Sequence, residues 1–153
     1  MKKKNLYLAL LLTVSAFCNC STKLQFAQTS EVKYNSYVDG VITVNTIGFG
    51  NNKSESIYQA EKNAFEVLFF RGLPESPLNK PLIDNEQVKN EKSSFFKSFY
   101  SDNRYKSFIT YSNLVSEYTK KQQSISNIEM SINVSALRKE LESNGIIKKF
   151  GLY

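Results

Sequence analysis

Apolar and polar positions change their period along the first part of the folded body. Over residues 37–49, β-branched apolar residues flanked by glycines predict a β-strand that ends in a glycine-rich turn. From residue 54 to residue 71, apolar residues recur with helical spacing and predict an amphipathic helix. Either Ser54 or Ser56 can cap the start of this helix, and Gly72 is the residue type that ends one.

The second part of the body opens with a loop that holds all three prolines of the chain, at residues 73–83. Proline lacks an amide donor and clashes with the preceding turn, which excludes a regular helix there. A helix, a strand, a strictly alternating strand and a short helix capped by Ser135 follow. The expected ranges of these four elements are 85–100, 104–116, 124–134 and 136–143, and a last helical turn at the start of 104–116 is an open alternative.

The order of the expected elements, β-α-α-β-β-α, is typical of an α+β domain. The last two strands are joined by a short polar link, so they are expected to pair antiparallel, and the alternation of the second implies one solvated face. We therefore expect one domain over residues 37–153. It is predicted to be a three-stranded, largely antiparallel sheet with helices packed on one face and a Pro-rich loop at 73–83.

The first twenty residues have the pattern of an export signal. Three lysines precede an apolar run of about 12 residues, whereas a membrane-spanning helix needs about 20. A cysteine soon after such a run is typical of a lipoprotein signal, in which that cysteine carries the lipid. Cys20 is the expected lipidated residue and Cys18 the alternative, while ordinary cleavage after Ala16 is a third interpretation. The sequence thus predicts an export signal at 1–20 and a polar tether at 21–36.

The expected location follows from this signal. A lipidated N-terminus would anchor the protein to a membrane, because several acyl chains together bind a bilayer stably. We expect an outer-membrane lipoprotein of the cell envelope that faces either the periplasm or the cell surface.

Composition narrows the chemistry that the body can perform. The chain has no histidine, and both cysteines fall within the signal, so the body lacks the commonest general base, thiol nucleophiles and the usual zinc ligands. The net charge of +6 includes the three signal lysines and leaves only about +3 for the body, which argues against a nucleic-acid partner. Gly48 and Gly50 lack the rest of a phosphate-binding fingerprint, and no carboxylate spacing demands an acid–base pair. The sequence predicts no catalytic residue, metal or cofactor, and the protein is expected not to be an enzyme.

Aromatic residues are the densest feature of the body, and the chain contains 11 Phe and 9 Tyr. The cluster between residues 95 and 111 is interpreted either as a ring-rich core or as an exposed docking patch. A second candidate surface joins the end of the first helix to the Pro-rich loop, because loops often carry partner contacts. The candidate partner-binding residues are Phe69, Phe70, Leu73, Phe95, Phe99 and Tyr100.

Four segments together resemble a known family: VNTIGFG, IYQAEKNAFEVLF, IEMSINV and SALRKELESNGI. Over residues 38–147 the chain resembles the small α+β domain of Helicobacter-type surface lipoproteins, also seen in the N-terminal domain of the flagellar ring protein FlgT. It is similar as well to lipoproteins of Bacteroidota, although the long 73–105 segment departs from the simplest family pattern. The resemblance implies a non-catalytic domain that assembles with other envelope proteins, and it transfers no catalytic residue.

Two functions are therefore expected. The first is a membrane-anchored structural or accessory lipoprotein of a trans-envelope complex of the secretion or motility type, with protein partners in the envelope. The alternative is a stand-alone periplasmic binding module for a small apolar or glycan ligand, which would need a pocket lined by aromatic rings.

Overall fold

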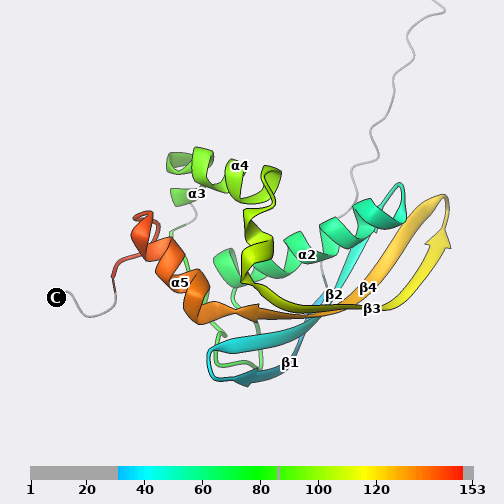
Figure 1. Ribbon diagram of the computed structural model, residues 1–153, viewed down its shortest axis with the longest axis horizontal. Coiled ribbons are helices and arrows are strands. Elements are labelled where there is room, and N and C mark those ends of the chain that lie inside the picture. The colour runs from blue at the N-terminus through cyan, green and yellow to red at the C-terminus, as the bar shows by residue number, and fades with distance from the viewer. Residues whose placement is uncertain (1–30, 86, 150–153) are drawn as a thin grey trace, which may run out of the picture.

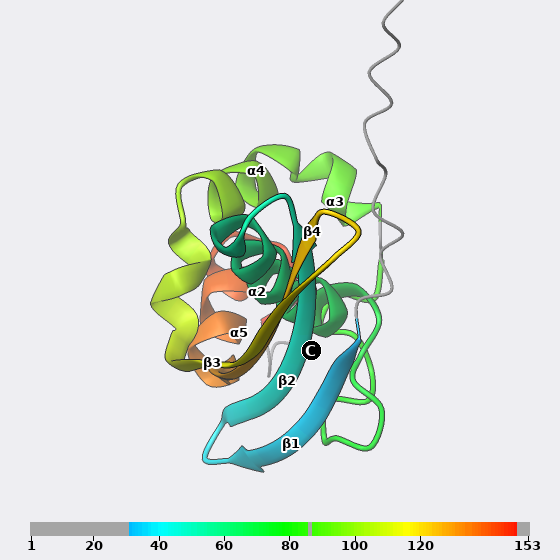
Figure 2. The same ribbon diagram turned by 90° about the vertical axis from the view of Figure 1, so that its right-hand side faces the viewer.

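The computed structural model describes residues 31–85 and 87–149, and these form an α+β fold. One antiparallel sheet of four strands, in the order β1-β2-β4-β3, carries the helices on one of its faces (Figures 1 and 2). The strands are β1 (Val32–Val38), β2 (Val41–Gly50), β3 (Ile109–Lys120) and β4 (Gln123–Asn133). The helices are α2 (Lys53–Phe70), α3 (Val88–Glu91), α4 (Ser93–Ser101), the 3₁₀ helix Arg104–Phe108 and α5 (Val134–Ser143).

The expected fold class is confirmed, but the sheet has four strands rather than three. Residues 32–36, assigned from the sequence to the polar tether, lie in β1, and the expected strand 37–49 holds the end of β1, the turn and most of β2. Asp39 and Gly40 turn the chain with φ of 49° and 78°, as a two-residue hairpin turn of type I′ requires. Strand β1 is mostly polar because only one of its faces contacts the core, through partly buried side chains such as Tyr34 and Tyr37.

The predicted hairpin between the last two strands is also present. Lys121 and Gln122 form its turn with φ of 48° and 65°. The expected helix over 85–100 is divided into α3 and α4, and the expected strand over 104–116 begins as the 3₁₀ helix, so that β3 starts only at Ile109. Within the described residues, no helix has both the length and the apolar content needed to span a bilayer.

Helix α2 lies directly against β2, and glycine makes this close approach possible. A Cβ atom built at Gly48 would lie 2.1 Å from the carbonyl oxygen of Ser56 and 2.2 Å from the amide nitrogen of Ala60. The hydroxyl of Thr46 donates to the carbonyl of Ala60 at 2.9 Å across the same interface. Gly48 is therefore a packing residue within β2, and its lack of a side chain sets the distance between helix and sheet.

Two helix caps differ from those expected. Asn52, and neither Ser54 nor Ser56, caps α2, since its Oδ1 accepts from the amide of Glu55 at 2.9 Å. At α5 the cap is Asn133, whose Oδ1 accepts from Ala136, and the expected cap Ser135 lies inside the helix. The side chain of Ser56 is buried and bonds instead to Ser126 on β4 at 2.7 Å. Asn52 and Asn133 each lie at a junction between a strand and a helix, and each has the extended backbone that an N-cap residue needs.

The predicted end of α2 is confirmed. Gly72 has φ of 76°, and its amide donates to the carbonyl of Val67 at 2.9 Å. Leu73 is 1% exposed, so the chain turns into the core as it leaves the helix. The Pro-rich loop then returns to the end of α2, where the amides of Leu82 and Ile83 donate to the carbonyls of Leu68 and Phe69.

Candidate functional site

The aromatic residues build the core between α2, α4 and the 3₁₀ helix. Phe65, Phe69 and Phe99 are fully buried, and their ring centroids lie 5.5 to 6.0 Å apart. Edge-to-face and tilted arrangements of this kind add stabilisation beyond the burial of the rings. Within the predicted cluster at residues 95–111, the burial supports a ring-rich core for every aromatic residue except Tyr111, which is 48% exposed.

The structure brings the six candidate partner-binding residues close to this core. Five of them are buried: Phe69, Leu73, Phe95, Phe99 and Tyr100. Phe70 alone is partly exposed, and the ammonium group of Lys89 lies 4.8 Å from its ring centroid. In this structure, the side chain of Phe70 is therefore accessible to a partner, whereas the other five side chains expose little surface.

Two buried phenols face carboxylates of α2. The hydroxyl of Tyr105 donates to Glu61 Oε2 at 2.7 Å, and both residues are buried. Burial is the main cause that raises the pKa of Tyr105 far above its ordinary value, and the hydrogen bond to Glu61 is the second cause. The pKa of Tyr100 is also raised, mainly by burial and secondly by the nearby negative charge of Glu66. Both phenols therefore keep their protons at neutral pH, which suits a structural role rather than that of a base or nucleophile.

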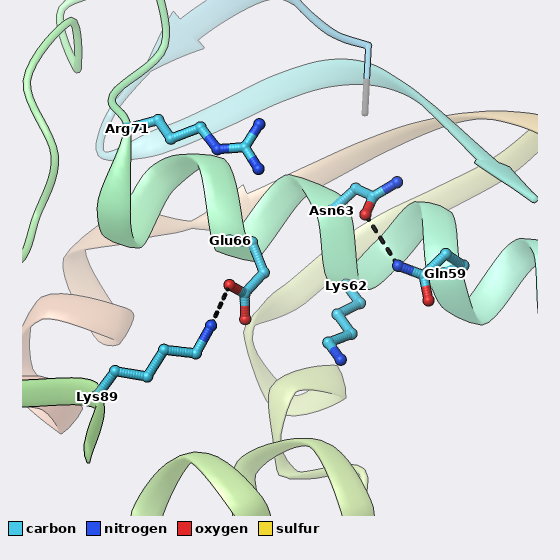
Figure 3. Close-up of a pocket in the computed structure, with 6 residues that line it drawn as sticks. All are labelled: Gln59, Lys62, Asn63, Glu66, Arg71 and Lys89. Atoms are coloured by element: carbon cyan, nitrogen blue, oxygen red, sulfur yellow. Dashed lines mark hydrogen bonds and ion pairs between the residues drawn. The ribbon is translucent and has the colours of Figure 1, made fainter. Parts of the chain in front are cut away.

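A small polar pocket lies on the surface of α2 and is shown in Figure 3. Its volume is about 100 Å³, room for a few waters or a small ion. Glu66 pairs with Lys89 at 2.7 Å, and the ammonium of Lys62 lies 5.1 Å from the ring centroid of Tyr100. In Figure 3, Lys62 and Lys89 lie on one side of the helix and Arg71 on the other. The three cations thus do not converge on one point, and we assign no ligand to this pocket.

A larger groove lies between the end of the Pro-rich loop, α3, α5 and the segment after α5. Its volume is about 360 Å³, at the lower end of the range of small-ligand sites. The amide of Ile146 donates to the carbonyl of Leu141 at 2.8 Å and turns the chain back towards the core. The apolar part of the lining consists of Leu82, Ile83, Val88, Ile146 and Ile147.

Charged side chains add polarity to this groove. Arg138 and Lys148 supply two cations, and Asp84 supplies one carboxylate. No aromatic ring lines the groove, so it is not the ring-lined pocket that the ligand-binding alternative requires. Sequence reasoning did not single out these residues, because they come from three separate segments and no local pattern connects them.

The face of the sheet opposite α2 is polar at its centre. Asn35 on β1 donates to Glu129 on β4 at 3.1 Å and accepts from Asn45 on β2 at 3.0 Å. Thr43 and Ser131 share a hydrogen bond at 2.8 Å on the same face. This hydrogen-bonded face agrees with the solvated face that the alternation of β4 predicted.

Exposed apolar side chains lie at the two edges of the sheet. Val38 on β1 is 63% exposed, and Val115 and Tyr118 on β3 are each 54% exposed. Among the described residues, no three His, Cys, Asp or Glu side chains gather into a metal-binding group. Cys18 and Cys20, the predicted lipidation sites, lie outside the described residues.

Comparison of the chain with protein families, with curated proteins and with solved structures found no match.

Proposed function

We propose that this protein is a non-catalytic, lipid-anchored accessory or structural protein of the bacterial cell envelope. In this proposal it sits at the outer membrane, facing the periplasm or the surface, and contributes to a trans-envelope complex of the secretion or motility type. One observation carries the proposal: residues 1–20 combine lysines, a short apolar run and a terminal Cys20. With residues 32–36 in β1, the proposed tether shortens to 21–31.

Internal partners of two α2 carboxylates support a structural rather than a catalytic role for these groups. The carboxylates of Glu61 and Glu66 are engaged by Tyr105 and Lys89, respectively. The aromatic rings are mostly used to fill the core. The proposed kinship of residues 38–147 with lipoprotein assembly domains is consistent with the same role.

Lipidation is tested by a matched pair of cysteine variants. We expect Cys20→Ser to release the protein from the membrane fraction and to abolish incorporation of a labelled fatty acid, because the thiol carries the lipid. Cys18→Ser is the control and should leave both readouts unchanged. The opposite result would move the lipid to Cys18, and loss of neither signal would refute lipidation.

The accessory role is tested by crosslinking intact cells that produce the full chain, followed by purification and mass spectrometry. We expect the same envelope proteins to be recovered in repeated experiments, and to be lost in the Cys20→Ser variant, since anchoring brings the domain to its partners. Recovery of the protein without any reproducible partner would refute this role.

One observation favours a second function that needs no ring-lined pocket, the binding of an aliphatic ligand with an anionic end. The 360 Å³ groove combines aliphatic walls with two cations, Arg138 and Lys148, against one carboxylate, Asp84, and this balance suits an apolar molecule with an anionic end. Titration with decanoate, followed by NMR, should shift the resonances of residues lining this groove, and Ile147→Glu should remove the effect. Unchanged spectra would remove this alternative, whatever the result of the lipidation test.

A further inference from the structure

Strand β3 has an outer edge that no other strand of the described sheet covers, because it is last in the order β1-β2-β4-β3 (Figures 1 and 2). It is 12 residues long, and all of its side chains are exposed except those of Ile109 and Leu114, which are half-buried. Three of the four large apolar side chains that are exposed in the described residues lie on it: Tyr111, Val115 and Tyr118. A long edge with exposed apolar side chains is a template for pairing with another strand.

The other edge strand, β1, is protected against such pairing. It has only 7 residues, and Lys33 within it forms an ion pair with Glu31 at 2.8 Å. Short length and a lysine at the edge are common ways in which proteins block strand addition. Neither edge strand contains proline and both carry a β-bulge, so the difference lies in length and in the placement of charge: on β3 the only charged residues, Glu117 and Lys120, lie in the last third of the strand.

We propose that β3 pairs antiparallel with β3 of a second copy of this chain about a two-fold axis, with Tyr111 of each copy opposite Tyr118 of the other. In a two-fold antiparallel pair, residue positions that face each other have a constant sum. Placing Tyr111 opposite Tyr118 also places Ser112 opposite Glu117 and Asn113 opposite Ser116.

A β-bulge makes this register possible. Tyr111 and Tyr118 are seven positions apart, so in a regular strand their side chains would point to opposite faces of the sheet. The register between β3 and β4 shifts between Leu114 and Ser116, which leaves Val115 as an extra residue. Because of this extra residue, both tyrosines lie on the same face of the sheet.

The pairing with β4 confirms which face that is. Tyr111 lies opposite Ser131 and Tyr118 opposite Ile125, and both of these β4 residues alternate with the residues that face α2. The neighbouring residues of β3 are opposite Met130 and Ser126, on the helix side of the sheet. In the Ser112–Glu117 pair and in the Asn113–Ser116 pair, the two side chains therefore also lie on the same face as each other.

Side-chain chemistry also suits this register. Two Tyr111–Tyr118 pairs form, one on each side of the axis, and cross-strand aromatic pairs stabilise sheets. Ser112 lies opposite Glu117, whose carboxylate pairs with Lys53 of its own copy at 2.9 Å, and Leu114 meets Val115 at the axis. No like charges lie opposite each other within the paired region.

The result is a closed dimer with one continuous sheet of eight strands. Each copy has one β3, so pairing through it uses the edge in both copies and cannot continue into a fibre. The proposed dimer depends on the folded domain and not on the export signal. Pairing can therefore fail while lipidation is confirmed, and lipidation can fail while pairing is confirmed. If both hold, the dimer carries two lipid groups and binds a membrane more firmly than one copy does.

The first test measures the mass of the purified full-length protein in mild detergent by analytical ultracentrifugation. We expect a dimer, and we expect Val115→Lys to raise its dissociation constant by about tenfold or more, because it places two lysines beside the axis. Val38→Lys is the matched control, since Val38 is similarly exposed but lies on β1. A monomeric protein, or equal weakening by both variants, would overturn the proposal.

The second test determines the register without a destabilising substitution. The photoreactive residue p-benzoylphenylalanine replaces Tyr118 in a protein grown with ¹⁵N, which is mixed with the unmodified ¹⁴N protein and irradiated. We expect crosslinks from the ¹⁵N copy to a ¹⁴N peptide that contains Tyr111. Crosslinks only within one copy, or only to β1 of the second copy, would overturn the pairing even if Val115→Lys failed to fold.

Discussion

Replacement of Gly48 by alanine is the sharpest test of how α2 is placed on the sheet. The new Cβ would lie 2.1 Å from the carbonyl oxygen of Ser56 and 2.2 Å from the amide nitrogen of Ala60. Both atoms belong to the main chain of α2, so no side-chain rotation relieves the contacts and the helix has to move off the sheet. That movement also breaks the hydrogen bond from Thr46 to the carbonyl of Ala60, now 2.9 Å long.

The cost of the Gly48→Ala change follows from two contributions. Overpacking of a dense interior costs about 1–3 kcal/mol, and the loss of one buried hydrogen bond adds about 0.5–1.5 kcal/mol. We therefore expect the free energy of unfolding to fall by about 1.5–4.5 kcal/mol, a large part of the roughly 5–15 kcal/mol that holds a domain together. For a domain of this size the midpoint of thermal unfolding should fall by about 6–18 °C.

Urea unfolding followed by far-ultraviolet circular dichroism measures this change. Ser36→Ala, at an exposed position of β1, is the control and should change the free energy of unfolding by less than about 0.5 kcal/mol. An equally small effect for Gly48→Ala would refute the close-packing argument. If the glycine served a phosphate loop instead, alanine would weaken nucleotide binding and leave stability unchanged.

Three other perturbations test single contacts of the domain. Tyr105→Phe should lower the free energy of urea unfolding by about 1–3 kcal/mol, because the buried carboxylate of Glu61 loses its 2.7 Å hydrogen bond. Folding raises the pKa of Tyr105, so its stabilisation is complete below about pH 10 and is lost as the pH rises further; urea midpoints should fall above pH 10, and less steeply in the variant. Asn52→Ala should cost about 0.5–2 kcal/mol and Ser54→Ala less than about 0.5 kcal/mol, and a larger loss at Ser54 would contradict the assigned cap. Gly40→Ala should lower the thermal midpoint by several degrees, because φ of 78° strains any residue with a Cβ; an unchanged midpoint would contradict that reasoning.

Periodic elements of the fold could be predicted from the sequence with small errors. The helix expected over 54–71 is α2, Lys53–Phe70, and the strand expected over 124–134 is β4, Gln123–Asn133. Both elements bury mainly one face against the same core, so their apolar spacing reflects which side chains point inward. Gly72 was expected to end α2 because left-handed φ favours glycine, and its φ of 76° confirms this.

Strand β1 was missed for a physical reason. Its residues are mostly polar because the strand is at the edge of the sheet and only Val32, Tyr34 and Tyr37 contact the core. A local signal was nevertheless present, since Asp39-Gly40 is a preferred pair for a two-residue hairpin turn. The caps Asn52 and Asn133 were also within reach of sequence reasoning, but nearby serines offered equally good candidates.

The sequence by itself determined the fold class, the main periodic elements and the absence of histidine and cysteine from the body. It also predicts the export signal at its start, a pattern that does not depend on folding. Only the tertiary structure decided that Phe99 fills the core, that Gly48 lies beneath a helix and that Val115 aligns two tyrosines on one face. Spacing along a chain reports which face of an element is buried, whereas contacts between distant segments depend on how the elements pack, and that information has no local signature.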